Sequence, residues 1–247
     1  RSSDLPRDLI ERKCRAARDE LLQRGLELVE TEPVADDPAG AQARRAIAEL
    51  SRAPFDVLVV CVAGWIPSQT VINVISPFAH KPMVLWGLTG QTEGGRLVTT
   101  ADQAGTSALR DPLDALGFRF KYVYDCPDGP ISAAEGVAAF ARVAHAAARL
   151  RRSRIGMMGY RDMNLYGTLV DGVSLRRVVG PEVESFDTLE IVQKMDAVSP
   201  VAVSALIADL RRAWTFTGPV DDAALEKSAR MFLALQGKIA ERGYEAI

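Results

Sequence analysis

Residues 56–87 read DVLVVCVAGWIPSQTVINVISPFAHKPMVLWG, and this stretch decides the fold class. Its two ends, Asp56–Val62 and Pro82–Trp86, are short apolar runs without polar alternation. Such runs are typical of parallel strands that are buried on both faces. The segment between them has apolar residues at helical spacing: Val71, Val74, Ile75 and Phe78. Strand, helix and strand in this order predict a βαβ unit.

The same alternation continues on both sides of this unit. The further elements that we predict are helix Asp8–Arg24, strand Leu26–Val29, helix Pro38–Ala53, loop Gly87–Thr106, helix Ser107–Leu116, strand Phe118–Tyr124 and helix Ala133–Leu150. This pattern predicts an α/β fold with a doubly wound, mainly parallel sheet of Rossmann-like type.

The pattern starts again at the strand Arg154–Met158. Later elements are predicted near Thr168–Val178 (helix), Glu184–Thr188 (short segment), Val201–Ala213 (helix), Asp221–Arg242 (helix) and Tyr244–Ile247 (start of a strand). We therefore predict an N-terminal domain at residues 1–152 and a second α/β domain at 153–247. Because the chain begins with a turn and a helix and stops at the start of a strand, we expect a portion of a longer protein, with the second domain incomplete.

Composition argues against several classes of partner. The formal net charge is −2, so nucleic acid and anionic membranes are not expected partners. The sequence shows neither a bilayer-spanning apolar stretch nor a signal peptide at its start. The three cysteines, Cys14, Cys61 and Cys126, are widely spaced and include no C-x-x-C pair. These features predict reduced thiols and a cytoplasmic protein.

Signals for a nucleotide, a metal ion or a nucleophilic triad are missing from the sequence. It contains neither G-x-G-x-x-G nor a P-loop string, so we do not expect a nucleotide cofactor. His80 and His145 have no second ligand at metal-binding spacing. We therefore expect both histidines to be structural, and a Ser-His-Asp triad is poorly supported.

The remaining candidates for a ligand site are the loops at the carboxyl ends of the strands, where open α/β sheets bind ligands. Two of them combine a tryptophan with a glutamine: Trp65 with Gln69, and Trp86 with Gln91. An indole can stack on the apolar face of a sugar while amides pair with its hydroxyls. The alternative is that both tryptophans fill a core or an interface. Sheet geometry adds the loop Tyr160–Asn164, with Tyr160 and Met163 as candidates, and favours Gln91.

Two longer strings resemble the L-fucose/L-arabinose isomerase family. Asp56–Val71 followed by Lys81–Gly90 is similar to its first domain, with Pro67-Ser68-Gln69-Thr70 in place of a Gly-Ser-Glu-Thr-like string and Trp86-Gly87-Leu88-Thr89-Gly90 after the second strand. Ser185–Asp196 is similar to a second-domain segment that ends in Met-Asp. These strings and the strand Arg154–Met158 occur in the family's order.

The resemblance implies a three-domain subunit that interconverts an aldose and a ketose through an ene-diol. A divalent cation, typically manganese, holds two sugar oxygens in such enzymes, and carboxylates move the protons. The metal-binding Glu, Asp and His belong to later parts of the family's sequences. We therefore expect them downstream of Ile247, and we expect residues 1–247 alone to be inactive.

The resemblance also implies substrate-binding residues and an oligomer. Trp65 corresponds to a tryptophan that enters a neighbouring subunit's active site, Gln69 lies in the matched string, and Arg1 corresponds to an arginine that reaches the substrate. The family therefore implies a homo-oligomer with shared active sites. Two other interpretations stay open: a periplasmic-type sugar-binding protein, and a non-catalytic isomerase homologue with a structural or regulatory role.

Overall fold

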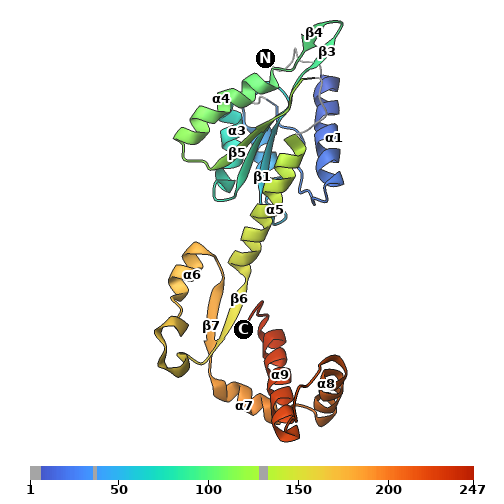
Figure 1. The fold of residues 1–247 in the computed structure, drawn as a ribbon. Helices are drawn as coiled ribbons and strands as arrows, with labels where there is room; N and C mark the ends of the chain where they lie inside the picture. Colours follow the sequence, from blue (N-terminus) through green and yellow to red (C-terminus); the bar gives the residue numbers. More distant parts are fainter. Residues whose placement is uncertain (1–6, 36–37, 128–132) are drawn as a thin grey trace. The chain divides into compact units, whose positions relative to one another are not determined.

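The computed structural model describes residues 7–35, 38–127 and 133–247, and the chain divides into two compact units. The first unit ends at Ala146 and the second begins at Ala147. The division lies inside helix α5 (Ala133–Arg152), ahead of the predicted boundary between residues 152 and 153. Figure 1 shows the elements of both units.

A parallel sheet forms the centre of the first unit. Its strands, among the described residues, are β1 (Leu58–Val62), β2 (Met83–Gly87) and β5 (Phe120–Tyr124), in the order β1-β2-β5. Both neighbouring pairs are parallel, with Met83 opposite Leu58 on one side and Phe120 on the other. The predicted α/β fold with a mainly parallel sheet is confirmed.

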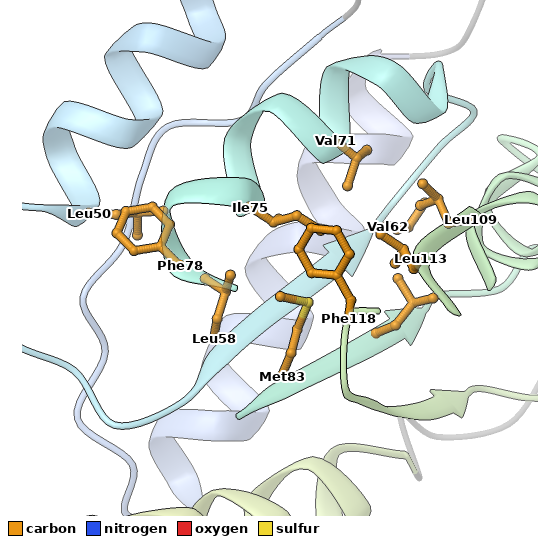
Figure 2. Close-up of a cluster of buried hydrophobic side chains, with 11 residues drawn as sticks. Leu50, Leu58, Val62, Val71, Ile75, Phe78, Met83, Leu109, Leu113 and Phe118 are labelled. Carbon is orange, nitrogen blue, oxygen red and sulfur yellow. The ribbon is translucent and has the colours of Figure 1, made fainter. Parts of the chain in front are cut away.

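One face of the sheet packs against the helix just before its first strand and against the two helices that lie between its strands. Side chains alternate across a strand, so Met83 and Leu85 point to the same face. There they join a buried cluster with residues of α2 (Ala41–Leu50), α3 (Ser68–Ile75) and α4 (Asp102–Ala115). Figure 2 shows this cluster, with Val71, Ile75, Leu109 and Leu113 above the strands.

The opposite face packs against the first described helix and against the helix that follows the last strand of the sheet. Val84 and Trp86 are fully buried there, in a cluster with residues of α1 (Arg7–Gln23) and α5. All five residues of β2 are therefore buried, as expected for the central strand of a sheet covered on both faces. Trp86 belongs to the core, so of the two tryptophans only Trp65 remains a candidate for ligand contact.

Two predictions for the first unit were wrong. Leu26–Val29 forms no strand. Leu26 and Leu28 are partly buried against the cluster that α1 and α5 form with the sheet, and they do not join the sheet's hydrogen-bond ladder. The predicted loop Gly87–Thr106 contains a hairpin of β3 (Gln91–Glu93) and β4 (Arg96–Val98), followed by the start of α4. Gly94 and Gly95 form the turn at positive φ, which glycine adopts at little cost.

The second unit contains a smaller parallel pair, β6 (Arg154–Met158) and β7 (Glu182–Phe186). Ala246 forms a parallel bridge to Ile155, in agreement with the predicted start of a strand at the chain's end. Its helices among the described residues are α6 (Gly172–Val178), α7 (Thr188–Asp196), α8 (Pro200–Ala213) and α9 (Asp222–Arg242). Phe186, Ile191, Ala234 and Tyr244 form its buried core.

Helix α7 was not predicted, although its sequence contains a start signal. Asp187 caps it by accepting a hydrogen bond from Leu189 N (2.7 Å), and Glu190 completes a capping box. The predicted helix at Thr168–Val178 is also shorter, since Tyr166–Thr168 forms a separate 3₁₀ turn before α6.

Among the described residues no single helix has both the length and the apolar composition of a membrane span. One pair, Thr188–Ala197 with Pro200–Ala213, meets both limits only when joined across a bend of 98°.

Candidate functional site

The carboxyl edge of the three-stranded sheet brings together the loops that follow β1, β2 and β5. Parallel strands end at the same edge, which is where ligands bind in folds of this kind. In the first unit the edge consists of Ala63–Pro67 after β1, Leu88–Ala101 after β2, and Asp125 after β5.

The loop after β1 is attached to the segment before α4 through main-chain atoms. Trp65 N donates to Thr100 O at 2.8 Å, and Thr100 Oγ1 donates to Ala63 O at 2.6 Å. Thr100 is completely buried, whereas 45% of Trp65 is exposed. The loop is therefore fixed at its backbone while an indole remains accessible to solvent.

A buried ion pair lies directly behind this attachment. Lys13 of α1 pairs with Asp102, the first residue of α4, and also donates to Thr100 Oγ1 at 3.1 Å. Asp102 is 1% exposed, and its second oxygen accepts from Thr99 Oγ1 and Gln103 N, each at 3.1 Å. The pair thus joins α1 to α4 beneath the edge of the sheet.

Asp125 forms a second buried polar centre at the end of β5. Its carboxylate accepts hydrogen bonds from Trp86 Nε1 (2.9 Å) and Ala133 N (3.0 Å), and its main-chain oxygen accepts from Gln103 Nε2 (2.6 Å). Burial raises the pKa of Asp125, and the two hydrogen bonds to its carboxylate oppose that shift. Asp125 therefore anchors β2, α4 and α5 to the end of β5.

The glycines at this edge allow close approach of the backbone. A Cβ placed on Gly87 would lie 2.8 Å from Thr106 Oγ1, and one on Gly90 would lie 2.4 Å from Val98 O. Both distances are far below van der Waals contact, so neither position accepts a larger residue without local movement. The Trp86–Gly90 string therefore has a packing role as well as its resemblance to a sequence motif.

The structure places the three predicted residues of the first unit at this end of the sheet or next to it. Trp65 is exposed in the loop after β1, and Gln69 is exposed on the first turn of α3. Gln91 opens the hairpin strand β3, where its amide donates to Glu93 Oε1. Their positions agree with a surface role, and their part in sugar binding stays a prediction.

Tyr160 and Met163 belong to the loop after β6 in the second unit. They are 76% and 78% exposed. Met163 and the next residue, Asn164, have positive φ values of 43° and 59°. Such backbone strain in a bulky residue is found most often at functional sites. The last predicted residue, Arg1, lies outside the described residues.

No group of three or more His, Cys, Asp or Glu side chains suited to a metal ion occurs within residues 7–35, 38–127 and 133–247. The two buried carboxylates at or just behind the sheet edge are already engaged, Asp102 with Lys13 and Asp125 with Trp86. The donor set of the described residues therefore does not fit the manganese ion that the resemblance implies.

Comparison with known proteins finds similarity over part of the chain. No model of a known protein family matches it. An L-fucose isomerase of Bacteroides thetaiotaomicron is 31% identical over 119 residues, which are 47% of this chain and 20% of that protein. Those of Bacteroides fragilis (118 residues) and Phocaeicola vulgatus (119 residues) are 32% identical, with the same shares.

This chain is similar to L-fucose isomerases over about half its length. The resemblance read from the sequence is confirmed, and the matched stretch spans about a fifth of each curated relative.

The buried polar residues behind this edge of the sheet were not predicted from the sequence. Lys13 carried a usable signal, since it lies at helical spacing from Ile10 and Ala17 on the apolar side of α1. A lysine in that position needs a buried partner. The sequence could not name Asp102, because 89 residues separate the two.

Proposed function

We propose that residues 1–247 are the N-terminal part of an aldose–ketose isomerase of L-fucose/L-arabinose isomerase type. The similarity of 31–32% identity to L-fucose isomerases carries this proposal. Two features support it: the parallel sheet with ligand-type loops at its carboxyl edge, and the exposed indole of Trp65 in one of those loops. The proposal places the manganese ligands and the proton-transferring carboxylates outside these residues.

Within this proposal the chain supplies contacts to the sugar. The ring of Trp65 stacks on the apolar face of the substrate, and the amides of Gln69 and Gln91 pair with hydroxyl groups. In the second unit, Tyr160 and Met163 contribute exposed side chains from a strained loop. The proposal further includes a cytoplasmic homo-oligomer in which Trp65 contributes to the active site of a neighbouring subunit.

A turnover assay on the intact protein tests the proposal. The protein is incubated with manganese and either L-fucose or L-arabinose, and formation of the corresponding ketose is followed. We expect turnover of at least one aldose. Sugar binding without ketose formation would instead identify a sugar-binding protein or a non-catalytic homologue.

The role of Trp65 is tested separately in the same assay. Trp65→Ala should raise KM by about three- to tenfold, since one aromatic contact contributes on the order of 1 kcal/mol. Manganese content should stay unchanged. Trp214→Ala is the matched control, because Trp214 is also exposed, at 62%, and lies in the second unit at the end of α8. Equal effects of both substitutions would contradict a specific role for Trp65.

A further inference from the structure

The loop that carries Trp65 is connected to α1 through a chain of buried polar contacts. Lys13 donates to Thr100 Oγ1, Thr100 Oγ1 donates to Ala63 O, and Thr100 O accepts from Trp65 N. The partners are distant in sequence: 87 residues separate Lys13 from Thr100, and 37 separate Thr100 from Ala63. Three separate segments therefore meet at one threonine.

Stability alone does not require a charged pair at the base of this chain. The side chains of Lys13 and Asp102 are only 13% and 1% exposed. Removing two charges from water is costly, and apolar residues of similar size often stabilise a buried site equally well. Hydrogen bonds to charged groups are, in contrast, strong and specific in geometry. Lys13 orients both Asp102 and the hydroxyl of Thr100, so the ion pair fixes the position of the Thr100 side chain.

Thr100 in turn fixes the position of the backbone of the loop after β1. Gly64 packs against Thr100, with a Cβ built on the glycine 3.5 Å from Thr100 Cβ. The neighbouring residue Trp65 is held by its main-chain N–H, while nearly half of it is exposed. The direction of the indole therefore depends on where Thr100 holds the loop.

We propose that Lys13 and Thr100 are positioning residues for Trp65, acting through the Lys13–Asp102 ion pair and the two hydrogen bonds of Thr100 to the loop. This inference rests on the proposed function, in which the ring of Trp65 contacts the sugar. It assigns a role to two residues that touch neither the substrate nor the metal ion.

Kinetics of double variants test the inference in the intact protein. Thr100→Val removes the hydroxyl at nearly constant shape, and Lys13→Met removes the charge. Each should raise KM about three- to tenfold with kcat changed less than about twofold. In a Trp65→Ala background, neither should raise KM further, because both act through the same contact. Additive effects on KM would overturn the inference.

Fluorescence gives a readout that does not depend on activity. The emission of Trp65 is obtained by subtracting the spectrum of each variant's Trp65→Phe counterpart. It should shift in Thr100→Val and return to the wild-type position in Thr100→Ser, which keeps a hydroxyl. Arg24→Met is the control, since it removes ion pairs with Glu20 and Glu135 just after the C-terminal end of α1 and should leave the emission unchanged.

The two proposals fail in different ways. If Trp65→Ala leaves KM unchanged for every sugar, the assigned substrate contact is wrong, while the fluorescence shift still supports positioning. If Trp65→Ala raises KM but Thr100→Val changes neither KM nor emission, the positioning role is wrong. Should Lys13→Met fail to fold, Thr100→Val decides the matter, because it leaves the ion pair in place.

Discussion

Gly87 ends the central strand where β2 comes close to α4. Thr106, the nearest residue to the Cβ position of Gly87, is fully buried, and its hydroxyl donates to Asp102 O at 2.6 Å. The threonine cannot turn away without losing that hydrogen bond. A methyl group at position 87 would therefore clash with the side chain of Thr106.

We expect Gly87→Ala to lower the free energy of unfolding of the first unit by about 1–3 kcal/mol, the usual cost of overpacking. Urea unfolding followed by tryptophan fluorescence, with Trp65 and Trp214 replaced by Phe so that buried Trp86 is the reporter, measures this change. Gly237→Ala is the control, because a Cβ there has open space inside helix α9. That substitution should stabilise the second unit by about 1 kcal/mol. A neutral result at Gly87 would show that α4 moves freely.

Asp125 gives a prediction for the dependence of stability on pH. Its pKa is raised in the folded protein, chiefly by burial, so the folded state holds the proton more tightly than the unfolded state. The resulting stabilisation is complete below the unfolded pKa and is lost as pH rises through the folded pKa. The unfolding free energy of wild type relative to Asp125→Asn should therefore fall as the pH rises above about 4, the ordinary pKa of an aspartate. If this free-energy difference instead increases as the pH rises, the pKa of Asp125 is lowered in the folded protein and the prediction is wrong.

At the scale of elements, the sequence predicts buried strands best. β1 lies within its predicted range, β6 coincides with its range, and β2 is shifted by one residue from its range, because a short uninterrupted apolar run is a direct sign of a parallel strand. Leu26–Val29, in which Glu27 interrupts the apolar residues, packs without a ladder, since a local pattern carries no information about hydrogen-bond partners. The polar centres at Lys13 and Asp125 escaped prediction for the same reason, because their partners come from distant segments.

Helix α7 depends on its cap, and this dependence can be measured. Asp187→Ala removes the hydrogen bond to Leu189 N and should destabilise the second unit by about 1 kcal/mol. Asp187→Ser keeps a capping oxygen and should recover most of this loss. Urea unfolding followed by circular dichroism compares the two variants. If both lose the same amount, the carboxylate acts through its charge and not as a cap.

At the scale of the molecule, the residues described here supply a sheet edge and an exposed indole, but no set of metal ligands. We expect a protein limited to residues 1–247 to show no aldose–ketose turnover and no specific manganese binding. Isothermal titration with manganese and the ketose assay measure both properties, with the intact protein as the positive control. Turnover by residues 1–247 would contradict the placement of the catalytic groups elsewhere.

The attachment of the loop after β1 has a consequence for changing specificity. Ala63 and Trp65 are held through a carbonyl oxygen and an N–H, so replacing the side chain at position 65 removes neither hydrogen bond. Evolution or a designed library can therefore exchange this one residue while the loop keeps its course. Under the proposed function, position 65 is therefore a place where substitutions can change the preferred sugar with little loss of folding stability.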